Sequence, residues 1–239
     1  MLFSEELKQN ATPILSAIED HPFVQGIATG TLPKEALTFY VGQDFNYLNA
    51  FIKVYAAAVE KCRDRSDMAI FNEQINFILN SEIHPHHVFC NVAGVPYESL
   101  QHAVQAPMTY LYNEHMYNAA RTGDLIDIVA AMLPCPWTYF EIANKLIAEG
   151  KNNDANVFKD WIDFYGSIAD DTDANLSDRF FALIDREAAN YNAARLAVIE
   201  RRFMRSCELE WDFWEQAYRQ QDWQFTPAKN LRQDQVIQH

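Results

Sequence analysis

The chain has 239 residues, of which 49% are hydrophobic and 22% charged, a composition typical of a folded globular protein. Its 33 acidic residues outnumber the 19 basic ones, for a formal net charge of −14. This balance disfavours nucleic acids and anionic membranes as partners, because both are bound by clustered Lys and Arg. The longest apolar run, residues 128–133, is shorter than the about 20 residues of a bilayer span. Without a visible signal peptide, we expect a cytoplasmic protein with reduced cysteines.

Helical spacing of apolar residues extends over almost the whole chain. There are only 7 glycines, where average usage of ~7% would give about 17, so turns should be few. No alternating strand pattern is found, which predicts an all-α protein. The predicted helices are 4–20, 22–29, 33–62, 66–92, 107–122, 124–133, 136–149, 154–168, 176–186 and 187–219. Since no linker or repeat interrupts them, we predict a single helical domain over 1–222 and a C-terminal tail over 223–239.

The predicted helix 33–62 carries an acid on its apolar face. Asp44 lies four residues after Tyr40 and three before Tyr47. A carboxylate on a buried face is costly unless something pairs with it. Two interpretations stay open: a tyrosine hydroxyl or an arginine of another helix satisfies Asp44, or the carboxylate belongs to a functional site.

The last predicted helix shows the same feature. Glu210 shares a face with Cys207 and Trp214, so it should point inward, whereas Glu208 should point away. A structural partner would again explain one buried acid. Two inward acids on two long helices of one domain favour a shared polar pocket.

Cys135 stands in an unusual local setting, just before Pro136. Because proline is favoured in the first turn of a helix, we expect the helix to begin at Pro136 with Cys135 as its N-cap. The positive end of the helix dipole there favours thiolate over thiol. Tyr139 follows one turn later on the same face. The alternative is a small buried apolar residue, which is what we predict for Cys62, Cys90 and Cys207.

Four tyrosines lie on mixed helix faces or near another candidate residue. A buried tyrosine needs a partner for its hydroxyl, and its ring can stack on a flat heterocycle. Core packing alone would also explain each of them. They are Tyr47, Tyr112, Tyr139 and Tyr165.

The histidines argue against a metal site. His84, His86 and His87 look like a metal cluster, but Pro85 interrupts the helical i, i+4 pairing that a zinc helix uses. After His115 there is no histidine before the last residue, so a helical di-metal site cannot be completed from a late helix. We therefore predict no metal and no cofactor, and we interpret the three histidines as a surface at a helix bend or as an oligomer contact.

Taken together, five segments resemble the TenA/thiaminase II family. They occur in the family's order and spacing, and the resemblance extends over about residues 1–222. The segments are 40–48 (YVGQDFNYL), 107–112 (PMTYLY), 133–139 (LPCPWTY), 161–165 (WIDFY) and 210–214 (EWDFW). The resemblance implies a haem-oxygenase-like helical bundle and a homo-oligomer, usually a tetramer. One departure is Leu209 before Glu210, where the family commonly has tyrosine.

The resemblance also implies a function in thiamin salvage. The family hydrolyses an aminomethylpyrimidine to hydroxymethylpyrimidine, and many members cleave thiamin itself. Carried over to this chain, Asp44 would hold the pyrimidine, Cys135 would be the nucleophile, and Glu210 would be the acid and base. The residues that would line the pocket are Tyr47, Tyr112, Tyr139 and Tyr165.

Other functions remain open at this point. One is a haem-oxygenase-like di-metal oxidase, which would need a late histidine that the chain lacks. Others are a non-catalytic helical module that binds a pyrimidine or a protein partner, and an unrelated binding protein for a flat heterocycle, none of which would use Cys135 chemically. The choice between thiamin and its aminomethylpyrimidine breakdown product also stays open.

Overall fold

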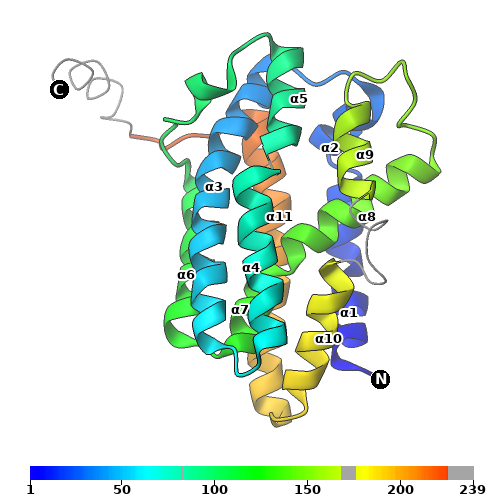
Figure 1. The fold of residues 1–239 in the computed structure, drawn as a ribbon. Helices are drawn as coiled ribbons and strands as arrows, with labels where there is room; N and C mark the ends of the chain where they lie inside the picture. The colour runs from blue at the N-terminus through cyan, green and yellow to red at the C-terminus, as the bar shows by residue number, and fades with distance from the viewer. Residues whose placement is uncertain (82, 168–175, 226–239) are drawn as a thin grey trace, which may run out of the picture.

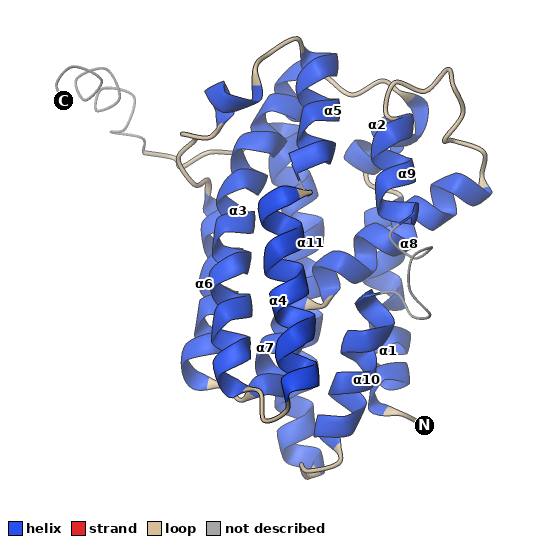
Figure 2. Ribbon diagram, in the orientation of Figure 1, coloured by secondary structure: helices blue, strands red, loops and turns tan. Residues whose placement is uncertain are grey.

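The computed structural model describes residues 1–81, 83–167 and 176–225. Within these ranges every regular element is a helix and none is a strand (Figure 2), so the all-α prediction is confirmed. The elements are α1 (Phe3–Glu19), α2 (Pro22–Thr29), α3 (Lys34–Lys61), α4 (Arg65–Asn80), α5 (Ile83–Ala93), the 3₁₀ turn η1 (Tyr97–Leu100), α6 (Pro107–Thr122), α7 (Leu125–Met132), α8 (Pro134–Ala148), α9 (Lys159–Ser167), α10 (Leu176–Ala188) and α11 (Ala193–Arg219).

Two long helices form the centre of the bundle. α3 and α11 have 28 and 27 residues and pack against each other along the long axis of the molecule (Figure 1). α4, α5 and α6 lie against α3, while α1 and α8 lie against α11. The inward acids of the two central helices can therefore approach one another across their interface.

One predicted helix, 66–92, is two helices in the structure. α4 ends with Ser81 as its C-cap, whose backbone leaves the helical region at φ −122° and ψ −36°. The ring of Pro85 would clash with the carbonyl four residues earlier, that of Ser81, if one helix continued through both. Pro85 is instead the third residue of α5, where it needs no intrahelical partner for an N–H.

The helix of Cys135 begins earlier than predicted. α8 starts at Pro134 with Leu133 as its N-cap, so Cys135 is its second residue and not the N-cap. Leu133 is itself helical and its N–H bonds the Val129 carbonyl at the end of α7. Two prolines can occupy this first turn because its N–H groups have no intrahelical acceptor.

Other boundaries also shift. The predicted helix 187–219 begins at Ala193, where the side chain of Asn192 caps it by accepting a hydrogen bond from the Arg195 N–H. The predicted helix 154–168 is α9 (Lys159–Ser167), and η1 was not predicted. Of the predicted tail 223–239, the structure describes 223–225, and 226–239 lie outside the described residues. Trp223 is anchored on the bundle by a 2.8 Å hydrogen bond to the Gln105 carbonyl.

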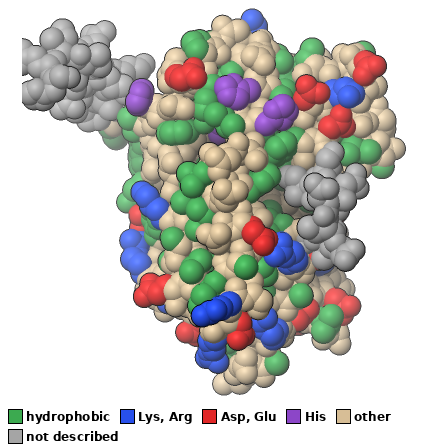
Figure 3. All heavy atoms as spheres, viewed as in Figure 1, with side chains coloured by type: hydrophobic (Ala, Val, Ile, Leu, Met, Phe, Trp, Pro, Cys, Tyr) green, Lys and Arg blue, Asp and Glu red, His purple; other side chains and the backbone are tan. Residues whose placement is uncertain are grey.

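The α7–α8 stretch is the most apolar part of the described chain. By length and composition Leu125–Ala148 could cross a membrane, but 78% of its apolar window is buried inside the protein. It is thus a core segment. The space-filling view shows a mixed surface, with histidines on the end of the molecule that carries α5 and most basic side chains towards the other end (Figure 3).

Polar residues of α3 hold the segment that leads into α6. The Gln43 amide donates to the Val104 carbonyl at 2.9 Å and accepts from the Ala106 N–H at 2.8 Å. Asn46 donates to the Ala103 carbonyl at 2.8 Å. A Cβ at Gly42 would lie 2.8 Å from that of Ala103, so glycine permits this close approach. These contacts fix α6, and with it Tyr112, relative to Asp44.

Candidate active site

One cavity gathers most of the predicted site residues. It has a volume of about 110 Å³ and is lined from α3, α4, α8, α9 and α10. Asp44, Cys135, Tyr139 and Tyr165 all line it. Four of the predicted residues, from the three helices α3, α8 and α9, therefore meet at one place.

The carboxylate of Asp44 lines this cavity from the middle of α3. Its exposed fraction is only 5%. One oxygen, Oδ2, lies 2.7 Å from Nε2 of His86 on α5. The sequence analysis left open whether Asp44 has a structural partner or a functional role; the structure supplies a partner and still places the carboxylate on the cavity wall.

Cys135 lines the same cavity from the first turn of α8. It is partly buried, whereas Cys62, Cys90 and Cys207 are buried. None of the four, all within the described residues, forms a disulfide. Although Cys135 is not the N-cap, it still lies at the positive end of the helix dipole, which favours a thiolate.

Glu210 does not line the cavity wall but lies beside it, in the core. Its exposed fraction is 2%, while Glu208 is exposed, so the inward direction of Glu210 is as predicted. The Tyr112 hydroxyl donates a 2.7 Å hydrogen bond to its Oε1. Burial raises the pKa of Glu210 to about 8; the bond from Tyr112 opposes this rise, and the nearby charge of Asp44 adds to it. At neutral pH Glu210 is therefore mostly a neutral acid.

Tyr47 lies close both to the Tyr112–Glu210 pair and to Cys135. Its ring centroid lies 4.9 Å from that of Tyr112. Burial raises the pKa of Tyr47 well above 10, and the charges of Cys135, Tyr112 and Glu210 raise it further, which shows that all three groups are close. A hydrogen bond with Tyr112 also raises the pKa of Tyr47, although the Tyr47 hydroxyl makes no hydrogen bond of standard geometry among the described residues. The buried O–H of Tyr47 thus lies near both Tyr112 and Cys135.

Aromatic rings form the walls of the cavity. The hydroxyls of Tyr40 and Tyr139 lie 2.6 Å apart, and both rings stack on Trp214, with centroid distances of 5.4 and 5.0 Å. Tyr165 meets Tyr139 edge-on at 4.9 Å. Burial raises the pKa of Tyr139 well above 10, so its phenol stays neutral. Flat aromatic walls with protonated hydroxyls suit a flat heterocycle with ring nitrogens.

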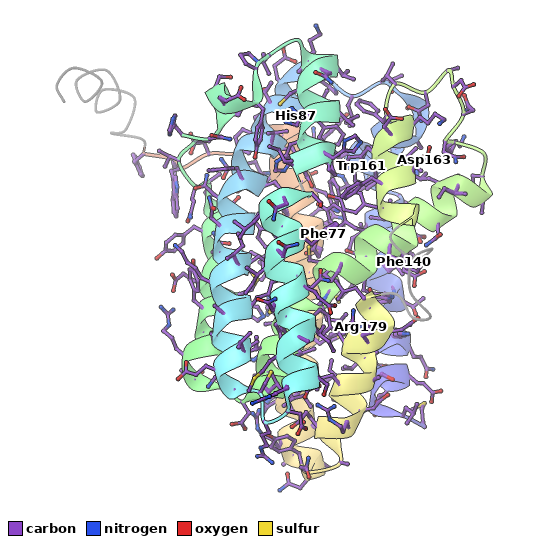
Figure 4. All side chains as sticks on the ribbon, in the orientation of Figure 1. Phe77, His87, Phe140, Trp161, Asp163 and Arg179 are labelled. Atoms are coloured by element: carbon purple, nitrogen blue, oxygen red, sulfur yellow. The ribbon has the colours of Figure 1, made fainter. Side chains whose placement is uncertain are left out.

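The side of the cavity formed by α4 and α10 could not be found from the sequence. It is lined by Gln74 and Phe77 of α4 and by Leu176 and Ser177 of α10, while Phe140 of α8 lines another part of the cavity (Figure 4 labels Phe77 and Phe140). Arg179 of α10 pairs with Glu73 of α4 at 3.0 Å and links the two helices there. These residues have no spacing signal that separates them from ordinary core and surface positions.

His86 is a buried residue beside Asp44 that the sequence analysis did not place at the candidate site. The prediction of a surface or oligomer contact is wrong for it, because its exposed fraction is 1%. A signal did exist: His86 shares its helical spacing with the buried residues Phe89, Cys90 and Ala93, so the same periodicity that turned Asp44 inward applies to it.

The other two histidines lie apart from the carboxylate. His84 is exposed, and the ring of His87 packs on Tyr97 at 5.1 Å. Within residues 1–81, 83–167 and 176–225, no group of three or more His, Cys, Asp and Glu is arranged to hold a metal ion. The three histidines thus have different surroundings, although they look like a metal cluster in sequence.

The chain is similar to known proteins over nearly its whole length. Residues 8–220 match the TENA/THI-4/PQQC family. A curated relative from Halalkalibacterium halodurans, named aminopyrimidine aminohydrolase, is 33% identical over 94% of this chain and 99% of its own. A relative of the same name from Staphylococcus saprophyticus is 32% identical over 96% of this chain and 100% of its own.

Solved structures show the same fold. A TenA family transcription regulator from a Silicibacter species has a TM-score of 0.78 at 29% identity, covering 90% of this chain and 95% of its own. A TenA homologue from P. horikoshii also has a TM-score of 0.78, at 26% identity, covering 92% and 99%. A Shewanella denitrificans domain described as having a heme oxygenase-like fold has a TM-score of 0.62 at 12% identity, covering 90% and 92%. The haem-oxygenase-like architecture predicted for the chain is confirmed.

Proposed function

The chain belongs to the TENA/THI-4/PQQC family, and from this premise we propose that it is a C–N hydrolase, an aminopyrimidine aminohydrolase of thiamin salvage. Its relatives of nearly full length carry that name. The proposed substrate is 4-amino-5-aminomethyl-2-methylpyrimidine, with thiamin as a second candidate because it contains the same pyrimidine. The product of both would be hydroxymethylpyrimidine.

The observation that carries this proposal is the composition of a single cavity. A carboxylate, Asp44, and a thiol at a helix N-terminus, Cys135, line it together, and a neutral buried acid, Glu210, lies beside it. These are the three groups that hydrolysis of an unactivated aminomethyl group on a pyrimidine needs: an anion for the ring, a nucleophile and a proton donor.

Asp44 would act on the ring. Its carboxylate would accept hydrogen bonds from the exocyclic amino group and from a protonated ring nitrogen. Charge-assisted hydrogen bonds of this kind favour the cationic pyrimidine, which is the better electrophile. The neutral phenols of Tyr139 and Tyr165 would orient the flat ring against the nucleophile.

Cys135 would then add to the ring as a thiolate. The buried O–H of Tyr47, which lies near Cys135, would donate to the sulfur. As the carbon–sulfur bond forms, electrons move towards the arm, and Glu210 would give its proton to the departing amine. Ammonia leaves, and the arm becomes an exocyclic methylene. Glu210 is now a carboxylate.

The second half of the reaction would regenerate the Cys135 thiolate and protonated Glu210. The carboxylate of Glu210 takes a proton from water, the hydroxyl adds to the methylene, and the thiolate leaves as the ring regains aromaticity. One water is consumed and one ammonia released, so the balance closes without a cofactor. Glu210 thus acts as acid first and base second, which a pKa near neutrality permits.

A homotetramer in the cytoplasm is part of the proposal on the family resemblance alone. Several large apolar side chains are exposed, namely Tyr110 and Leu111 of α6, Val104, Trp223 and Phe225. Light scattering after size-exclusion chromatography tests the tetramer.

The test is a turnover assay with thiamin and the aminomethylpyrimidine on wild type and Cys135→Ser. We expect hydroxymethylpyrimidine from wild type and none from the variant. Cys62→Ser is the matched control, because Cys62 lies at the C-terminal end of α3 and a serine can keep its bond to the Ala58 carbonyl. Equal turnover by Cys135→Ser would overturn Cys135 as the nucleophile, and binding without turnover by wild type would leave only a pyrimidine-binding module. The di-metal oxidase predicts metal in the purified protein.

A further inference from the structure

His86 is a buried residue that the mechanism above does not use. It projects from α5 towards α3, and its Nε2 lies 2.7 Å from Oδ2 of Asp44. On the other side of the ring, Nδ1 lies 3.2 Å from the hydroxyl of Tyr97 in η1. Figure 4 labels the next residue of α5, His87, whose ring packs on Tyr97. Three elements thus form one chain, from Tyr97 through His86 to Asp44.

The direction of each hydrogen bond follows from the groups involved. Burial raises the pKa of Tyr97, so its phenol keeps its hydrogen and can donate it. A carboxylate can only accept. With Nδ1 accepting from Tyr97, the imidazole carries its hydrogen on Nε2 and donates it to Asp44. The chain therefore selects one tautomer of His86.

We propose that His86 is a positioning residue for the reaction assigned above: its Nε2–H holds Oδ2 of Asp44 so that Oδ1 is presented to the pyrimidine. The inference rests on the proposed function and deepens it. The terminal torsion of an aspartate is broad, so without a fixed partner the carboxylate can rotate within the cavity. A donor on one oxygen removes that freedom and keeps the other oxygen available as an acceptor.

This arrangement predicts a specific kinetic pattern. His86→Leu should lower kcat/KM for the aminopyrimidine about 10- to 100-fold, mainly through KM, since a hydrogen bond to a charged group is lost. His86→Gln should stay within a few-fold of wild type, because the glutamine amide can donate from nearly the position of Nε2. His84→Leu is the matched control on the same helix and should change neither constant.

A double-mutant cycle separates positioning from a loss of packing. The readout is the affinity for hydroxymethylpyrimidine, measured by calorimetry, because Asp44→Asn is expected to be inactive. We expect His86→Leu to weaken binding in wild type and to have little further effect in Asp44→Asn. Equal effects of His86→Leu in both backgrounds, or equal losses in His86→Leu and His86→Gln, would overturn the inference.

The tautomer itself can be measured without turnover. In the ¹⁵N NMR spectrum of histidine-labelled protein, Nδ1 of His86 should appear as the unprotonated ring nitrogen and Nε2 as the protonated one. Tyr97→Phe should shift the Nδ1 signal. A hydrogen found on Nδ1 would overturn this inference alone. If wild type neither binds nor hydrolyses an aminopyrimidine, the proposed function is overturned and this inference with it.

Discussion

The Tyr112 hydroxyl donates a hydrogen bond of 2.7 Å to Oε1 of Glu210, joining α6 to α11 beside the cavity. Burial raises the pKa of Glu210 to about 8. The hydrogen bond from Tyr112 stabilises the carboxylate and so lowers this pKa. The proton of Glu210 is thus available near neutral pH.

The rate should depend on pH through Glu210. Since the amine leaves with a proton from Glu210, kcat should fall as pH rises through about 8. Tyr112→Phe removes a bond that lowers this pKa, so the alkaline limb should move to higher pH while kcat drops about tenfold. Measuring kcat from about pH 6 to about pH 10 checks both effects. If the fall of kcat at high pH stays at the same pH in Tyr112→Phe, then a group other than Glu210 causes it.

Glu210 should also make stability depend on pH. The folded state holds its proton up to about pH 8, whereas the unfolded chain loses it near 4.5, so the free energy of unfolding falls as pH rises between these values. The loss is roughly 5 kcal/mol at most. We expect Glu210→Gln to melt at a higher temperature than wild type at pH above 8 and at nearly the same temperature near pH 4.5. Glu208→Gln, on the exposed face, is the control. If the stability difference between Glu210→Gln and wild type does not grow with pH, Glu210 is not protonated in the folded state.

Alkylation should distinguish one cysteine from the other three. Burial raises the pKa of Cys62 and Cys90 to about 11 and that of Cys207 well above 9, so these stay thiols. Cys135 is partly buried, at a helix N-terminus, on the cavity wall. Iodoacetamide near neutral pH should label Cys135 alone, as read by mass spectrometry, and bound hydroxymethylpyrimidine should protect it. Labelling of Cys207 at a similar rate would refute this.

A buried ion pair away from the cavity should affect stability but not chemistry. Asp127 of α7 is buried and pairs with Arg195 and Arg202 of α11. Burial alone would raise the pKa of Asp127, but the hydrogen bonds from Arg195 and from the Asp124 backbone, together with the charges of Arg195 and Arg202, outweigh burial and lower this pKa. Arg195→Leu should cost about 3 kcal/mol near neutral pH, with kcat per folded molecule unchanged.

This cost has a defined pH range and a matched control. A lowered pKa contributes stability above pH 3.8, and that contribution is lost as pH falls through the folded value. The difference between Arg195→Leu and wild type should therefore shrink in acid. Arg205→Leu breaks an exposed pair with Glu208 and should cost less than about 1 kcal/mol. A similar loss of unfolding free energy in both variants would show that the buried Asp127 pair stabilises the fold no more than an exposed pair does.

The local features of this protein could be predicted from its sequence. Helical class, and the inward direction of Asp44 and Glu210, depend on the 3.6-residue period of a single helix, which neighbouring residues determine. The boundaries around Pro85 and Pro134 were predicted less well, because a proline can either end a helix or open one. Which it does depends on how the flanking helices pack.

Only the tertiary structure decided how these residues combine. Asp44 and His86 are 42 residues apart and meet because α5 packs across α3. Tyr112 reaches Glu210 over 98 residues of chain. The raised pKa of Glu210 likewise needs burial by several helices at once, and no sequence window contains that environment. Periodicity specifies the direction in which a side chain leaves its own helix, and only the packing of helices specifies what it meets there.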